Sequence, residues 1–264
     1  MKITEFGTEN KKTFLLLPGT SCTWECNFDL LIKPLAEKYH VLCVNYTGFD
    51  GGTAIFDTQT AETKRIEQYI KWRFGSCLDA VYGSSMGGSF ASLLVQRKRI
   101  HIDHVFVGSS DLDQASPFVA KIETAIISIF LKRLAKNPEK ALQKFSKVGE
   151  AKGMGMSEDD FKKDGVSEDY MQHMLKGFCD TLQKVDMQSV KNQFYSDLVT
   201  KLDDNISAPE TVIHVFHSKK MGEKYLQRYR QHYAKPDIIP LDYGHEGWLG
   251  NPDLMMQIFR TKMQ

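Results

Sequence analysis

The pentapeptide Gly83-Ser84-Ser85-Met86-Gly87 constrains the fold more than any other stretch of this sequence. An apolar run, residues 78–82, precedes it, and a run that favours a helix, residues 88–95, follows it. A serine on a sharp turn from strand to helix points its oxygen off the edge of a sheet, above the N-terminus of the next helix. Such a turn strains the serine backbone and leaves room only for small residues two positions away, as Gly83 and Gly87 are. The pattern predicts that Ser85 is a nucleophile.

Length and charge limit the classes of protein that remain. A chain of 264 residues can bury one large core, or a core plus a sizeable insertion. The net charge is +1, and no basic face is recognisable, so we expect no nucleic-acid partner. The N-terminus lacks the apolar stretch of a signal peptide, and no apolar run approaches the ~18 residues of a membrane span. We therefore expect no membrane partner.

The five cysteines indicate neither a disulfide framework nor a metal site. Their number is odd, and no two of them form a C-x-x-C pair. This usage predicts a cytoplasmic protein. Cys22 and Cys26 are close in sequence, but no further cysteine or histidine follows at ligand spacing. No metal or organic cofactor is implied.

Apolar runs and helical periodicity alternate along the first hundred residues. The runs predict strands at 13–17, 40–46, 78–82 and 102–108, with helices at 27–38 and 60–72. Alternation of this kind is typical of a parallel sheet with helices on both faces, the α/β class. It resumes late in the chain, with strands at 211–216 and 237–241 and helices at 222–232 and 253–262.

Between these two parts the pattern is helical, without a convincing strand. Helices are predicted at 118–134, which is apolar on one side, at 138–145 and, as one or two helices, at 170–202, with a polar loop at 149–165. We interpret residues 112–208 as a helical cap inserted into a core formed by residues 1–111 and 209–264. Methionine and phenylalanine recur in the cap (Met154, Met156, Met171, Met174, Met187, Phe145, Phe161, Phe178 and Phe194). They indicate either ordinary packing or the lining of an apolar substrate chamber.

A serine hydroxyl needs a base to accept its proton, and histidine is the usual base near neutral pH. His245 follows the last predicted strand in a loop bracketed by glycines, which places it at the same edge of a parallel sheet as Ser85. The alternative is a surface histidine that caps the last helix. Of the other histidines, His214 lies inside a strand, and His101 and His104 come before the strand ends at which Ser85 is predicted to lie. His217 remains the one close contender.

Stabilisation of a tetrahedral oxyanion requires two backbone N–H donors. The amide of Met86, directly after the nucleophile, is the first. The second is predicted in the loop Pro18-Gly19-Thr20-Ser21 after the first central strand, where we assign the amide of Thr20. Ser21 is the alternative if the loop is shifted by one residue.

The order of these motifs resembles the α/β-hydrolase family, from about Thr13 to the C-terminal helix. The resemblance implies a mostly parallel central sheet with a helical cap insertion, and a triad acid after the strand that precedes the histidine strand. The family pattern there is G-x-x-D, but here Met221 falls at the acid position and Glu223 lies two residues further on. Some family members carry the acid one strand earlier, where Asp111 and Asp113 follow Gly108.

Each of these acids has a structural alternative. Glu223 fits the first turn of a helix, where negative charge is favourable, and Asp111 or Asp113 fits a helix N-cap. The absence of any triad acid also stays open. Asp242 is too close to His245 in sequence to reach behind its ring.

Together these residues predict a serine hydrolase acting on a small-molecule acyl substrate. Ser85 would attack the carbonyl of a small or medium carboxylic ester or thioester, with His245 as the base. Two other functions fit the same residues: acyl transfer to another alcohol or thiol, and ligand binding with a silent triad.

Overall fold

The computed structural model describes residues 1–137 and 163–264. Within them seven strands form one sheet, in the spatial order β1-β3-β2-β4-β5-β6-β7. The strands are β1 (Lys2–Phe6), β2 (Thr13–Leu17), β3 (His40–Asn45), β4 (Cys77–Ser84), β5 (His101–Gly108), β6 (Val212–Ser218) and β7 (Asp237–Leu241). Every neighbouring pair is parallel except β1 with β3. The mostly parallel sheet predicted from the sequence is confirmed.

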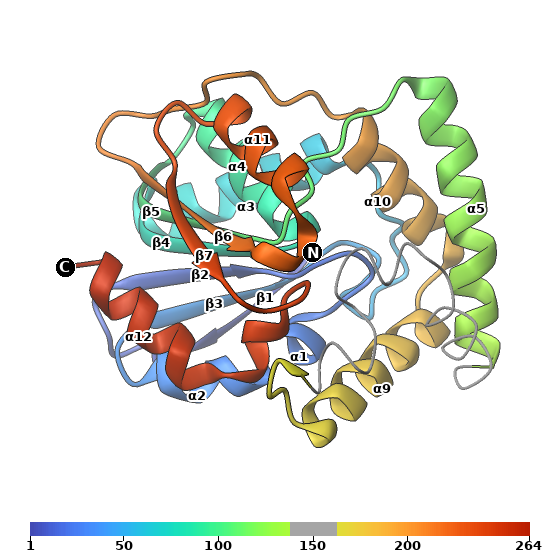
Figure 1. The fold of residues 1–264 in the computed structure, drawn as a ribbon, viewed down its shortest axis with the longest axis horizontal. Coiled ribbons are helices and arrows are strands. Elements are labelled where there is room, and N and C mark those ends of the chain that lie inside the picture. Colours follow the sequence, from blue (N-terminus) through green and yellow to red (C-terminus); the bar gives the residue numbers. More distant parts are fainter. Residues whose placement is uncertain (138–162) are drawn as a thin grey trace.

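Helices cover both faces of this sheet, as predicted (Figure 1). They are α1 (Trp24–Asn27), α2 (Asp29–Ala36), α3 (Gln59–Phe74), α4 (Met86–Arg97), α11 (Glu223–His232) and α12 (Pro252–Lys262), with short 3-10 helices η1 (Lys219–Met221) and η2 (Gly247–Gly250). Helices α2 and α12 lie on one face, and α3, α4 and α11 lie on the other. Each face therefore has its own hydrophobic core.

Strand β2 shows why a short apolar run becomes a central strand. Its side chains alternate between the two cores: Leu15 and Leu17 pack on the α3–α4 face, and Phe14 and Leu16 pack on the α2–α12 face. All four are fully buried. A strand buried on both faces must be apolar at every position, which is the pattern of this segment.

Two features of the fold differ from the sequence prediction. Strand β1 was not predicted, because an edge strand pairs on one side only and its sequence, KITEF, mixes polar and apolar residues. The short helix α1 was not predicted either: it covers Trp24–Asn27, ahead of the helix predicted at 27–38, which is α2. The other predicted helices and strands in the described residues are confirmed, with ends shifted by a few residues.

In the described residues between β5 and β6 there are three helices: α5 (Pro117–Lys136), α9 (Glu168–Lys184) and α10 (Met187–Val199). Helix α5 packs against both α9 and α10, and Figure 1 shows the three together on one side of the molecule. The described part of this segment contains no strand, as expected. The helix predicted at 138–145 and residues 149–162 of the predicted loop lie outside the described residues.

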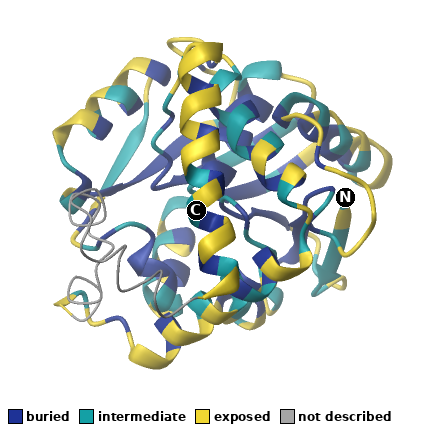
Figure 2. Cartoon of the chain, turned by 90° about the vertical axis from the view of Figure 1, so that its right-hand side faces the viewer, coloured by how far each residue is buried: buried dark blue, intermediate teal, exposed yellow. Residues whose placement is uncertain are grey.

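The apolar side of α5 faces outward. In Figure 2, where this helix faces the viewer, most of its outer surface is exposed. Phe118 is 74% exposed and Ile126 is 65% exposed, and Ile122 and Ile129 are exposed on the same side. The opposite, buried side carries small residues at helical spacing in its first half, Ala120, Thr124 and Ser128, and the leucines Leu131 and Leu134 in its second half. Small side chains therefore let the first half of α5 approach its neighbours closely, whereas the second half packs into the α3–α4 core through leucine.

Several of the recurrent methionines and phenylalanines contribute to the cores. Met171 is buried on the α2–α12 face, whereas Phe178 and Met187 pack on the α3–α4 face. Met154, Met156, Phe145 and Phe161 lie outside the described residues. A chamber lined by members of this set stays a prediction.

We expect Gly87→Ala to destabilise the fold by about 3 kcal/mol or more, because a Cβ at this position would overlap the carbonyl oxygen of Leu17 in β2. Gly75→Ala is the matched control. Gly75 has a φ of 61°, in the left-handed region, but nothing lies within 4 Å of its missing Cβ, so the control has backbone strain without a steric overlap. The control should cost only about 1 kcal/mol. Urea denaturation of both variants measures the difference, and equal losses would contradict the close approach of α4 to β2.

Candidate active site

Ser85 occupies a strained turn between β4 and α4. Its φ is 50° and its ψ is −117°, a conformation that costs a non-glycine residue on the order of 1–3 kcal/mol. The turn is tied to the neighbouring strand, because the amide of Ser85 donates to the carbonyl of Gly108 at 2.8 Å. This is the strand–turn–helix unit predicted from the pentapeptide.

Glycine is required on both sides of the turn. A Cβ on Gly83 would overlap the backbone of Gly87, and a Cβ on Gly88 would lie 2.7 Å from the Cβ of Ser110. The first turn of α4 therefore lies directly against the ends of β2, β4 and β5. This approach brings the N-terminus of α4, with the amide of Met86, next to Ser85, the predicted nucleophile.

The loop after β2 lies against the same turn. A Cβ on Gly19 would sit 3.4 Å from the Cβ of Ser85. Two hydrogen bonds hold this loop: the amide of Gly19 donates to Asn27 Oδ1 at 2.7 Å, and the amide of Ser21 donates to Gln193 Oε1 at 2.8 Å. Because the Ser21 amide is engaged by a side chain of α10, Thr20 is the better of the two predicted oxyanion donors.

His245 lies in the segment between β7 and α12 and is half-buried. Burial of its ring lowers the pKa of His245 to about 4, so the imidazole is neutral near pH 7. Its Nδ1 atom is shielded from solvent and has no hydrogen-bond partner within residues 1–137 and 163–264. The ring is therefore in the protonation state of a base but is not oriented by an acid.

In the described residues, the acids predicted for the triad do not contact the ring of His245. Glu223 begins α11 with its side chain 63% exposed, 3.7 Å from Arg230. Its charge raises the pKa of His217, opposing the effect of burial.

Asp111 and Asp113 are tied to α11 and to each other. The amide of Asp113 donates to Asp111 Oδ1 at 3.2 Å, and Arg228 donates to the Asp111 carbonyl at 2.9 Å while pairing with the Asp113 carboxylate. Burial raises the pKa of Asp111. In the described residues, neither these two acids nor Glu223 makes a hydrogen bond to His245.

The loop after β6, where the resemblance implies an acid, holds a lysine contact instead. Lys220 pairs with Asp164 Oδ1, and Asp164 Oδ2 accepts the amide of Gly244 at 2.5 Å. Asp164 was not identified from the sequence. Its side chain is only 1% exposed, and both of its oxygens are engaged. It contacts the backbone beside His245, not the imidazole ring.

Glu246 is the second residue that sequence reasoning missed. Its buried carboxylate lies under the nucleophile turn, where Oε2 accepts the hydroxyl of Tyr82 at 2.7 Å and Oε1 accepts the amide of Ser85 at 3.1 Å. Burial raises the pKa of Glu246 to about 7. The available signal was a single charged residue within Gly244-His245-Glu246-Gly247-Trp248. Through this side chain the His245 loop touches the nucleophile turn.

The other histidines have different environments. His214 is buried in β6, 2.7 Å from Asp237 and 3.2 Å from His104, and His101 lies 2.8 Å from Asp103. His217, at the end of β6, packs edge-on against Tyr229. Burial lowers the pKa of His217.

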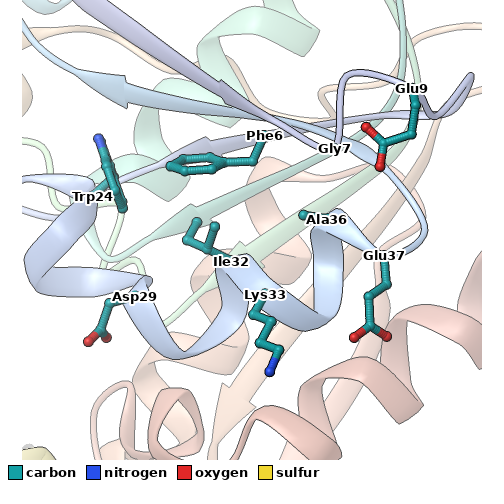
Figure 3. Close-up of a pocket in the computed structure, with 9 residues that line it drawn as sticks. All are labelled: Phe6, Gly7, Glu9, Trp24, Asp29, Ile32, Lys33, Ala36 and Glu37. Atoms are coloured by element: carbon teal, nitrogen blue, oxygen red, sulfur yellow. The ribbon is translucent and has the colours of Figure 1, made fainter.

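The structure also bears on metal sites and on pockets away from Ser85. No group of three or more histidine, cysteine or acidic residues that could hold a metal occurs in the described part of the chain. Cys22 and Cys26 hydrogen-bond to each other, and burial contributes to a raised pKa of Cys22. A surface pocket of about 630 Å³ lies beside β1 and α2 (Figure 3), lined by Phe6, Trp24 and Ile32 among others, but by none of the predicted site residues. No helix among the described residues is long and apolar enough to cross a membrane.

Comparisons with known proteins support the fold. Neither the protein-family profiles nor the curated protein sequences give a match to this chain. Among solved structures, an α/β hydrolase family protein from Desulfitobacterium hafniense superposes with a TM-score of 0.78 at 13% identity, covering 100% of both chains. MenH from S. aureus gives 0.69 at 14% identity, covering 100% of this chain and 98% of that one. An esterase from Thermogutta terrifontis gives 0.67 at 15% identity, covering 99% and 92%. The chain has the α/β-hydrolase fold.

The two adjacent titrating residues should give opposite pH dependences of stability. His245 has a lowered pKa, so the stability it contributes is lost as pH falls from about 6.5 to 4. Glu246 has a raised pKa, so the stability it contributes is lost as pH rises from about 4.5 to 7. The two effects oppose each other in wild type. We expect His245→Gln to lose stability as pH rises and Glu246→Gln to lose stability as pH falls, by about 1.4 kcal/mol per unit of pKa shift.

Urea denaturation at half-unit steps between pH 4 and 8 measures both slopes. Parallel pH profiles for the two variants would show that these groups are not the ones that titrate.

Proposed function

We propose that this protein is a serine hydrolase that cleaves small or medium carboxylic esters or thioesters through an acyl-enzyme. The observation that carries the proposal is the strained turn of Ser85 with the His245 loop tied to it through Glu246. Strain of this kind persists where the surrounding structure enforces it, and it is concentrated at functional sites. Several solved proteins of similar fold are esterases or serine hydrolases.

The proposed mechanism follows from the positions of these groups. Ser85 Oγ attacks the acyl carbon while neutral His245 accepts its proton. The amides of Met86 and Thr20 stabilise the oxyanion, and the imidazolium then protonates the leaving alcohol or thiol. Water, deprotonated by the same imidazole, releases the carboxylic acid and regenerates Ser85. The helices between β5 and β6 would cover the acyl chain.

A second candidate function has support from one observation. His245 Nδ1 has no acid partner among the described residues, as expected of a ligand-binding protein with a silent triad. Labelling by a fluorophosphonate distinguishes the two functions, because only an activated serine reacts quickly. Rapid labelling that disappears in Ser85→Ala favours the hydrolase, and labelling no faster than for a heat-denatured sample favours ligand binding.

We expect hydrolysis of p-nitrophenyl esters to fall by about 10³-fold or more in Ser85→Ala and in His245→Gln. Ser207→Ala, at an exposed serine, is the control and should retain wild-type kcat/KM. Esters from acetate to octanoate are compared, and medium acyl chains should be cleaved faster than acetate if apolar residues of the α5–α10 segment line the site. Turnover that survives in Ser85→Ala would remove the nucleophile assignment.

A further inference from the structure

The active-site histidine lacks the side-chain partner that usually fixes its position. Its Nδ1 atom has no hydrogen-bond partner in the described chain, since the Glu223 carboxylate lies 3.7 Å from Arg230 and the Asp111 carboxylate accepts the amide of Asp113. Proton transfer from Ser85 nevertheless requires the ring at hydrogen-bond reach of the hydroxyl. Something other than a triad acid must therefore hold the His245 loop in place.

The residues on either side of His245 are both anchored. On one side, the amide of Gly244 donates to Asp164 at 2.5 Å. On the other side, Glu246 makes contacts from both its backbone and its side chain. Its amide donates to Ser109 Oγ at 3.3 Å, and its carboxylate accepts from Tyr82 at 2.7 Å and from the Ser85 amide at 3.1 Å.

These contacts reach the nucleophile itself. The amide of Ser85 is shared between the Gly108 carbonyl at 2.8 Å and Glu246 Oε1 at 3.1 Å. Tyr82 is fixed in turn, because Trp248 Nε1 donates to its hydroxyl at 3.0 Å. Among the described residues, Glu246 is thus the side chain that joins the segment carrying His245 to the turn carrying Ser85 by hydrogen bonds.

The surrounding backbone is shaped around this carboxylate. A Cβ on Gly108 would lie 2.8 Å from Glu246 Oε1. Strand β5 therefore leaves space for the carboxylate of Glu246 only because residue 108 is glycine. Glu246 itself has a φ of 59°, in the left-handed region that a non-glycine residue rarely adopts. The left-handed backbone of Glu246 and the absence of a side chain at Gly108 both permit the carboxylate of Glu246 to reach the Ser85 turn.

We propose that Glu246 is a positioning residue for the Ser85–His245 pair, holding the His245 loop against the nucleophile turn through hydrogen bonds to Tyr82 and to the Ser85 amide. This inference rests on the proposed function. Glu246 acts in place of the orienting acid by fixing the backbone next to the base, and it does not touch the substrate.

The ionised form of Glu246 is the one that makes these contacts, because a carboxylate accepts two hydrogen bonds without competing as a donor. Burial raises the pKa of Glu246 to about 7. The groups whose titration its charge affects are Cys22 in the loop after β2, Tyr82 in β4, Tyr170 in α9 and Tyr229 in α11, and the pKa of each is raised. All four are neutral near pH 7, as is His245.

The contacts therefore weaken as Glu246 takes up a proton. In wild type, kcat/KM should rise with pH in two steps, one near 4 as His245 loses its proton and one near 7 as Glu246 does.

The test compares wild type, Glu246→Gln, Glu246→Ala and Ser85→Ala in ester hydrolysis. Glu246→Ala should lower kcat by about 10²-fold and leave KM within about 3-fold, since displacement of a reacting group by about 1 Å costs that much. Glu246→Gln keeps one acceptor oxygen, so the loss in kcat should be about 10-fold and the step near pH 7 should disappear. Fluorophosphonate labelling rates should fall in the same order.

Glu210→Gln is the matched control, because Glu210 has the same φ of 59° but is exposed. Glu210→Gln should keep the wild-type kcat and KM and the wild-type step near pH 7. Circular dichroism at the assay temperature establishes that each variant is folded, and the pH step in Glu246→Gln remains informative even if Glu246→Ala unfolds.

Two results would overturn the inference, and they differ in whether the hydrolase proposal survives. If wild type shows Ser85-dependent turnover and Glu246→Gln keeps both the wild-type kcat and the step near pH 7, Glu246 has no positioning role and the hydrolase proposal stands. If wild type shows neither turnover nor labelling beyond Ser85→Ala, the proposed function fails and the positioning role fails with it.

Discussion

The turn at Ser85 requires three backbone segments to meet at a separation that excludes a single methyl group. The end of β4, the first turn of α4 and the end of β2 converge there, and glycine at positions 83 and 87 makes the contact sterically allowed. The strained φ and ψ of Ser85 are then imposed by the segments that flank it. The two apolar cores hold those segments in place, because β2 and β4 are buried on both faces. The close approach fixes the amide of Met86 and the loop at Gly19 beside the nucleophile at the same time.

The segment that carries the base is placed by a different means. The two residues next to His245 are each held through a carboxylate. The Gly244 amide donates to the carboxylate of Asp164, and the carboxylate of Glu246 itself accepts the amide of Ser85. Asp164 is itself paired with Lys220, in the loop where the family resemblance places the triad acid. Hydrogen bonds from the backbone on both sides of His245 limit the motion of this short loop. The described residues supply no hydrogen bond to Nδ1 of the ring, so the orientations open to the imidazole are limited by the packing that shields that atom from solvent.

The nucleophile turn and the alternation of strands and helices could be predicted because they depend on residues close together in sequence. The glycines around Ser85 and the run of β2 are local patterns with one physical explanation each. The side of α5 that faces the protein could not be predicted in this way. Periodicity shows that a helix has two unlike sides, but in the first half of α5 the small residues Ala120, Thr124 and Ser128 face inward while Phe118, Ile122 and Ile126 are exposed, and the usual rule holds only in the second half, where Leu131 and Leu134 are buried. Glu246 was missed for a related reason. Its burial depends on Tyr82 and on Ser85, 161 residues away, and a charged residue in a glycine-rich loop is ordinarily exposed.

The charges of the site show why a carboxylate next to the base has consequences beyond anchoring. At pH between about 4 and 7 both His245 and Glu246 are neutral, so the resting site avoids the cost of burying an unpaired charge. In the proposed mechanism, attack by Ser85 would create an imidazolium, and a histidine whose pKa is near 4 is a weak base for that step. An ionised Glu246 places a negative charge under the Ser85 turn, where its carboxylate accepts from Tyr82 and from the Ser85 amide, whereas the lowered pKa of His245 comes from burial of its ring. The same charge opposes the oxyanion, and the amides of Met86 and Thr20 would have to offset that repulsion. The proposed mechanism therefore requires these backbone donors to be held in fixed positions, and the hydrogen bonds from Asn27 and Gln193 to the loop at Gly19 meet that requirement for the second donor.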